Sequence, residues 1–139
     1  MPIRVIRLGT PRVRGEGLRL GTVRRPPRGV RKTDYAKRDY YDVWLPELAP
    51  SAAVVSWAHA ADWTPARWRK YVRTYLREMR EPVARHLIAT LAALSRQADF
   101  SIGCYCADAA WCHRSLLAGL LEDAGGAVRP FEGRKETRP

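Results

Sequence analysis

Apolar side chains alternate with polar ones at the start of the chain and form short runs further along it. Ile3 and Val5 alternate with basic residues, which is typical of a strand with one buried face. Phe100 and Ile102 lie in a short apolar run, which indicates a buried strand. On such patterns we expect strand pieces over residues 2–8, 18–23, 41–45, 99–104 and 127–131. Most of the predicted strand residues therefore lie near the two ends of the chain.

The middle of the chain carries apolar residues at helical spacing. We expect helices over residues 51–59, 64–79 and 82–97, and a last helix that starts near residue 112. Thr64 suits the N-cap of the second helix, and Pro65 suits its first helical position. The last helix is expected to stop at Gly125-Gly126.

Two of these helices have a predicted buried face. The face of the second helix consists of Trp68, Tyr71, Val72, Tyr75, Leu76 and Met79. The face of the third helix consists of Val83, Leu87, Leu91 and Leu94. Basic residues lie mostly off the first of these stripes, so we expect them to face solvent.

Strands separated by helices predict an α/β fold. We expect one domain over residues 1–131, a mostly parallel sheet flanked by helices in a Rossmann-like or flavodoxin-like arrangement, and a loose polar tail over 132–139. No apolar run has the length of a membrane-spanning helix, and the first residues lack the apolar core of a signal peptide. The sequence therefore predicts a cytoplasmic protein with no membrane partner.

Positive charge is concentrated at the start of the chain. Residues 1–40 hold twelve Lys or Arg and three acids, so they carry +9 of the net charge of +11. Within them, residues 24–32 contain five basic side chains together with two prolines and a glycine, which exclude a helix and an interior strand. A stiff loop that presents arginines suits phosphate or carboxylate. We expect nucleic acid or a phosphate-bearing small molecule as the partner; a solvated surface loop is the alternative.

All three cysteines lie between the last long strand and the last helix. Cys104 is expected at the end of the strand, Cys106 in the loop and Cys112 in the first turn of the helix, beside His113 and Arg114. A helix N-terminus and a nearby cation both stabilise a thiolate. Because a Cys-His-Arg run is polar, we expect Cys112 to be accessible and reactive.

Three interpretations of the cysteines remain open. One cysteine is a nucleophile or redox group, or the cysteines bind zinc with a histidine, or they are small buried hydrophobic residues. The spacing C-x-C-x5-C-H differs from paired C-x2-C zinc motifs, so we expect no stoichiometric metal. The spacing from either Cys104 or Cys106 to Arg114 is also too long for the phosphate loop of a protein tyrosine phosphatase.

Two blocks of the chain resemble the YeaO-like family, also named domain of unknown function 488. One block contains Cys104, an eight-residue step to Cys112, and then His-Arg-Ser and two leucines. The other block runs over residues 17–34 and contains Pro-Arg-Gly. The usual Asp-Arg and tryptophan of that block are Val23-Arg24 and Pro26 here. The resemblance implies a single α/β domain whose characteristic loops gather at one end.

These observations lead to one set of candidate residues. The catalytic candidates are Cys112, Cys104 and His113, and the anion-binding candidates are Arg24, Arg28 and Arg114. The predicted function is an enzyme-like pocket for a phosphate-bearing or nucleic-acid substrate, with a reactive cysteine and without a cofactor. The alternative is a non-catalytic basic protein that binds nucleic acid.

Overall fold

The central feature of the fold is a parallel sheet. The computed structural model describes residues 2–133, so most of the predicted tail lies outside the described residues. The strands are β1 (Ile3–Arg7), β2 (Leu18–Gly21), β3 (Val43–Trp44) and β4 (Phe100–Cys104). They form an all-parallel sheet in the order β1-β4-β2-β3. The predicted strand piece over 127–131 is a single parallel bridge between Val128 and Ile3.

Helices follow where the apolar spacing predicts them. They are α1 (Ala52–His59), α2 (Pro65–Glu78), α3 (Pro82–Leu94) and α4 (His113–Asp123), with 3-10 turns η1 (Lys32–Asp34), η2 (Pro46–Leu48) and η3 (Ala109–Trp111). The Thr64 hydroxyl accepts a hydrogen bond from the Arg67 amide at 3.1 Å, so the predicted cap is confirmed. Gly125 adopts a φ of +94°, and the Gly126 amide donates to the Leu121 carbonyl, which ends α4. The predicted single α/β domain with a parallel sheet flanked by helices is confirmed.

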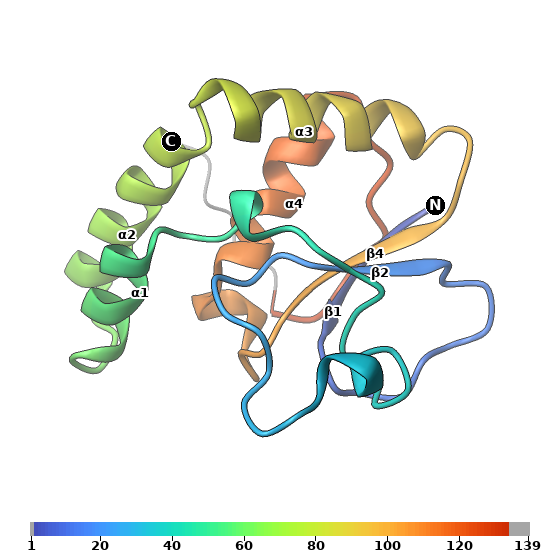
Figure 1. The fold of residues 1–139 in the computed structure, drawn as a ribbon. Coiled ribbons are helices and arrows are strands. Elements are labelled where there is room, and N and C mark those ends of the chain that lie inside the picture. Colours follow the sequence, from blue (N-terminus) through green and yellow to red (C-terminus); the bar gives the residue numbers. More distant parts are fainter. Residues whose placement is uncertain (1, 134–139) are drawn as a thin grey trace.

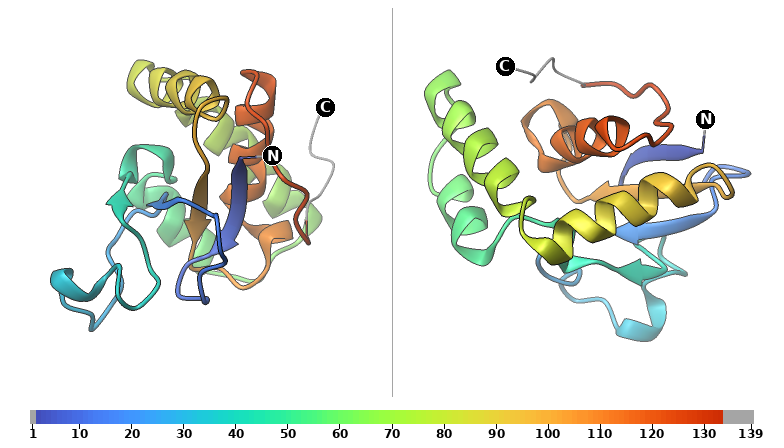
Figure 2. Two further views of the ribbon diagram at one scale, coloured as in Figure 1. Left: turned by 90° about the vertical axis from the view of Figure 1, so that its right-hand side faces the viewer. Right: turned by 90° about the horizontal axis from the view of Figure 1, so that it is seen from above.

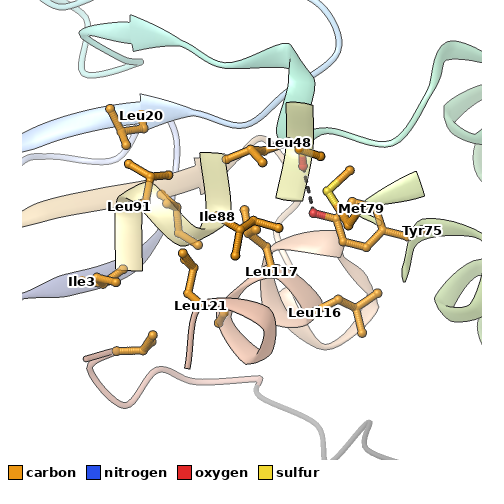
Figure 3. Packing of buried hydrophobic residues seen from close by; sticks show 14 of the residues in the cluster. Ile3, Leu20, Leu48, Tyr75, Met79, Ile88, Leu91, Leu116, Leu117 and Leu121 are labelled. Atoms are coloured by element: carbon orange, nitrogen blue, oxygen red, sulfur yellow. Dashed lines mark hydrogen bonds between the residues drawn. The ribbon is translucent and has the colours of Figure 1, made fainter. Parts of the chain in front are cut away.

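One face of the sheet is covered by helices. Figures 1 and 2 show α3 and α4 on this side, with α1 and α2 together beside the first turns of α4. Figure 3 shows the core between them, where the Tyr75 hydroxyl donates to the Leu48 carbonyl at 2.8 Å. The fully buried apolar side chains include Ile3, Leu48, Ile102, Leu117 and Leu121. Burial of this apolar surface is the main stabilising contribution on this side.

The other face of the sheet is covered by chain that is mostly irregular. The blue-to-cyan segment that contains η1 lies on this side in Figures 1 and 2. Gly21 and Gly103 allow close contact here: a Cβ at Gly21 would lie 2.3 Å from the Tyr41 ring, and one at Gly103 would lie 2.5 Å from Leu8. Buried Arg19 anchors this covering through an ion pair with Glu16.

The predicted buried face of α3 is partly wrong. Val83 is 61% exposed and Leu94 is 47% exposed. Leu91 is buried as predicted, and the other buried residues of the helix are Ala84, Ile88 and Ala92. The face is therefore rotated toward small side chains, which allow α3 to pack closely against α4. Among residues 2–133, no helix has both the length and the hydropathy to cross a membrane.

Candidate functional site

The cysteines lie at the carboxyl end of β4, where the chain leaves neighbouring strands in opposite directions. After β1 and β2 the chain covers the irregular side of the sheet, while after β4 it enters α4 on the helix side. Such a switch point leaves a crevice at the strand ends, which is where open α/β sheets bind ligands. The sequence predicted that the cysteines lie between this strand and the last helix, and the structure places them there.

Three sulfur atoms converge at this end of β4. Cys104 is the last residue of β4, Cys106 lies in the following loop, and Cys112 is the N-cap residue of α4. Their Sγ atoms all lie within 4.8 Å of one another, and those of Cys104 and Cys106 are 3.8 Å apart. All three are free thiols. The fold thus brings together Cys106 with the two cysteines that we expected in the site.

The predicted accessibility of Cys112 is wrong. Cys112 is 0% exposed, and His113 and Arg114 are 4% and 5% exposed. The polar Cys-His-Arg run is buried with partners inside the protein: His113 contacts the Thr22 carbonyl, and Arg114 donates to the carbonyls of Cys104 and Cys106. Cys106, which is half-buried, is the most accessible of the three cysteines.

The electrostatics favour Cys104 as the ionised sulfur. Hydrogen bonds from the Cys106 and Cys112 thiols, together with the charge of Arg114, lower the pKa of Cys104 well below its usual value. The pKa of Cys112 is raised, first by burial and then by its interaction with Cys104. The same interaction with Cys104 raises the pKa of Cys106. Of the three sulfurs, Cys104 is therefore the one whose surroundings favour the thiolate.

His113 is held as a neutral side chain. Its Nε2 lies 2.5 Å from the Thr22 carbonyl oxygen, and its Nδ1 lies 3.8 Å from the Cys112 sulfur. A carbonyl only accepts, so we assign the proton to Nε2 and a free lone pair to Nδ1. Burial lowers the pKa of His113 to about 4, which keeps the ring uncharged near neutral pH.

The predicted anion-binding arginines do not form one group. Arg114 Nη1 donates to the carbonyls of Cys106 and Cys104, at 2.6 Å and 3.4 Å. Arg24 donates to the carbonyls of Pro50 and Ala49 and lines a separate surface cleft of about 540 Å³, which no cysteine lines. Arg28 is exposed on its loop. Arg114 therefore fixes the shape of the cysteine loop, and Arg24 fixes the start of its own loop.

The Arg7 side chain and the backbone of Arg25 border the cysteine loop; neither residue was among the six candidates, although Arg25 lies in the predicted basic loop. Arg7 Nε donates to the Tyr105 carbonyl at 3.1 Å, and the Tyr105 hydroxyl donates to the Arg25 carbonyl at 2.8 Å. Both arginines are exposed. Tyr105 separates Cys104 from Cys106, so these contacts join the end of β1 and the basic loop to the cysteines. The signal in the sequence was the position of Arg7 at the end of a strand.

A cluster of aromatic rings packs against the part of the cysteine loop next to Cys112. Trp63 stacks on Trp111 with ring centroids 6.1 Å apart, and Tyr75 contacts His113 at 5.5 Å. Trp68, from the buried face of α2, also contacts Trp111. Aromatic contacts of this kind restrict the residues on either side of Cys112.

The fold and the site together define a single-domain α/β protein with a buried three-cysteine centre. The model of the active DUF488-N3 subclade matches residues 3–125, so the chain belongs to the DUF488 family. The expected family is therefore confirmed. No curated protein and no solved structure matches the chain.

Proposed function

We propose that this protein is an enzyme that uses Cys104 as a nucleophile on a phosphate-bearing substrate, either a small molecule or a nucleic acid. The convergence of three sulfur atoms at the end of β4 carries the proposal. Cys112 is 0% exposed, which excludes it from the role of attacking group, whereas Cys104 is buried but keeps 6% of its surface exposed at the end of β4. The family description, an active subclade, agrees with an enzyme.

The chemistry follows from the positions of the three thiols. The Cys104 sulfur forms a bond to the electrophilic atom of the substrate, and the bond from that atom to the leaving group breaks. The leaving group takes the electron pair, and the Cys106 thiol, 3.8 Å from the Cys104 sulfur, is placed to supply its proton. Water then attacks the same atom and breaks its bond to Cys104: the hydroxyl goes to the released group, the proton returns to Cys106, and Cys104 leaves as the thiolate.

The exposed arginines at the rim support an anionic substrate. Arg7 and Arg25 are joined through Tyr105 to the loop that carries the cysteines. A positively charged rim raises the local concentration of anions around a site. Arg28 lies on the same loop as Arg25 and adds to this charge.

Alkylation with two reagents tests the nucleophile and the rim together. Iodoacetamide is neutral and iodoacetate is an anion. The ratio of their alkylation rates at Cys104 therefore measures the electrostatic potential that nearby arginines create at this sulfur. We expect peptide mapping to show Cys104 modified in the folded protein while Cys112 is protected. In the Arg7→Ala/Arg25→Ala variant, the iodoacetate rate should fall by about 3- to 10-fold and the iodoacetamide rate should stay unchanged.

The control is Arg85→Ala, which removes an exposed arginine from α3 and should leave the ratio unchanged. Modification of Cys104 only after unfolding would overturn its role as the nucleophile. An unchanged ratio in the rim variant would instead overturn the proposed anion site.

A non-catalytic nucleic-acid-binding protein is the second candidate. The observation in its favour is the basic loop, where Arg25, Arg28, Arg31 and Lys32 are all exposed. Phosphate contacts of this kind give affinity that falls steeply with salt. Salt-dependent binding of single- or double-stranded DNA that is equal in the parent and in Cys104→Ser, with no substrate turned over by either, would favour this function.

A further inference from the structure

The three sulfur atoms have a second capability that goes beyond the proposed nucleophile. We propose that Cys104, Cys106 and Cys112 together bind one Zn²⁺ ion as thiolates, in a site with an open fourth position. The inference uses the same side chains as the proposed function, but it does not require Cys104 to attack a substrate. It rests on the distances between the sulfurs and on the way in which the fold holds them.

The spacing of the sulfurs matches a zinc site. A Zn–S bond of about 2.3 Å in a tetrahedral site places neighbouring sulfurs about 3.8 Å apart. The Cys104 and Cys106 sulfurs are 3.8 Å apart, and all three sulfurs lie within 4.8 Å of one another. Small side-chain rotations therefore suffice to close the site around an ion.

The ligands come from a framework that is fixed by other contacts. Cys104 ends the central strand, and Cys112 caps α4, where its carbonyl accepts hydrogen bonds from the amide and hydroxyl of Ser115. The carbonyl of Cys106 accepts from Arg114 at 2.6 Å. The fold therefore brings Cys104 and Cys112 together although eight positions separate them in the sequence. The unusual spacing of the motif, which was our reason to expect no metal, does not prevent the three sulfurs from meeting.

Charge is also balanced at this position. Three thiolates and Zn²⁺ carry a net charge of −1, which buried surroundings disfavour unless a positive group is close. The Arg114 guanidinium contacts the carbonyls of two of the three ligand residues, and the N-terminus of α4 begins at the third. Both contribute positive potential.

The fourth ligand does not come from His113. Its Nδ1 lies 3.8 Å from the Cys112 sulfur, but His113 does not belong to the group of ligand atoms that lie within 4.8 Å of one another. Its Nε2 is committed to the Thr22 carbonyl. Three protein ligands with a fourth position left for water or substrate are typical of a reactive rather than a purely structural zinc site.

Zinc binding and nucleophilic attack both use the Cys104 sulfur. A thiolate that binds Zn²⁺ donates one of its lone pairs to the ion, so Cys104 is a weaker nucleophile with zinc bound than as a free thiolate. Zinc occupancy is therefore expected to protect Cys104 and to suppress the proposed reaction. The loss of zinc would then expose the nucleophile.

Metal titration of the reduced, chelator-treated full chain tests the inference. With Co²⁺ as a probe, we expect one ion per chain and a thiolate-to-cobalt absorption band in the near ultraviolet that one equivalent of Zn²⁺ removes. Cys106→Ser should weaken binding by about 10- to 100-fold or more. Because Cys106 is half-buried, this variant is the least disruptive of the three cysteine replacements. The His59→Gln/His86→Gln variant removes two exposed histidines and should bind as the parent does.

Alkylation of the same samples separates this inference from the proposed function. We expect Zn²⁺ to slow the modification of Cys104 by about tenfold or more. If Cys104 of the metal-free protein reacts but neither the cobalt band nor zinc protection is seen, the zinc site is wrong and the nucleophile stands. If the band appears but metal-free Cys104 is inert, the nucleophile is wrong and the zinc site stands. A cobalt band that survives in Cys106→Ser at unchanged affinity would also overturn the three-cysteine site.

Discussion

The two faces of the sheet are covered in different ways. On the helix side, Ile102, Leu117 and Leu121 are fully buried among other apolar residues. On the other side, Arg19 is 1% exposed and pairs with Glu16, and its guanidinium also donates to the carbonyl of Thr10 at 2.7 Å. One covering is held by apolar burial and the other by a buried polar network.

The comparison shows how irregular chain can cover a sheet. Buried polar groups are costly unless each has a partner, and Arg19 supplies donors to a carboxylate and to the carbonyls of two loops. The Asp42 carboxylate, which pairs with Arg12, accepts from the backbone amide of Arg19. The cysteine site lies where the two coverings meet, so its shape depends on both.

Removal of the buried arginine is expected to have the largest effect. Arg19→Met leaves the buried Glu16 carboxylate without its partner, so the free energy of unfolding should fall by about 3–5 kcal/mol. Urea denaturation measures this change. The exposed Arg14→Met is the control and should shift stability by less than about 0.5 kcal/mol. A loss of similar size in both variants would contradict the anchoring role.

Truncation on the helix side should cost about as much or slightly less. Leu117→Ala removes a fully buried side chain and leaves a cavity, which should lower the free energy of unfolding by about 2–5 kcal/mol. Leu94→Ala, at a leucine that is 47% exposed, is the matched control and should cost far less. Equal losses in thermal denaturation would mean that the buried face of α3 is the one predicted from the sequence.

A smaller effect is expected at the closest contact on the irregular side. Gly21→Ala places a Cβ 2.3 Å from the Tyr41 ring, and the resulting overpacking should cost about 1–3 kcal/mol. Tyr41 packs in one cluster with Cys104, so alkylation of that cysteine should also become faster. Gly119→Ala has open space and lies inside α4, so it should instead stabilise by about 0.5–1 kcal/mol. Destabilisation by both variants would show that the contact with Tyr41 is not the cause.

Acid is expected to produce the smallest effect, and only on the polar side. Burial alone raises the pKa of Glu16, but hydrogen bonds from Arg19 and the Val13 amide outweigh it and lower that pKa below 4.5. A folded-state pKa below the unfolded one means that this stabilisation is present above pH 4.5 and is lost as the pH falls through the folded value. Glu16→Gln should flatten the acid limb of the stability curve, whereas Leu117→Ala should lower the curve without changing its slope. Parallel acid limbs in Glu16→Gln and the parent would contradict this assignment.

Local signals determined the elements of the fold. Thr64 and Pro65 mark the start of α2, and Gly125 marks the end of α4, because capping and left-handed backbone depend on the residue at that position. The buried face of α3 was harder to predict, since Ala84 and Ala92 are small residues whose burial depends on other segments that pack against the helix. Periodicity identifies a helix, but the neighbour decides which side it covers.

The sequence by itself also determined where the cysteines lie, since a strand followed by a cysteine loop and a helix places them at the strand end. Only the tertiary structure decided what the site contains. It brought Cys106 beside Cys104 and buried Cys112, and it turned Arg114 toward backbone carbonyls. Distances between side chains, and the exposure of each, depend on contacts between segments far apart in the chain. Burial and those contacts, rather than residue type, set which thiol has a lowered pKa and which arginine side chain is exposed.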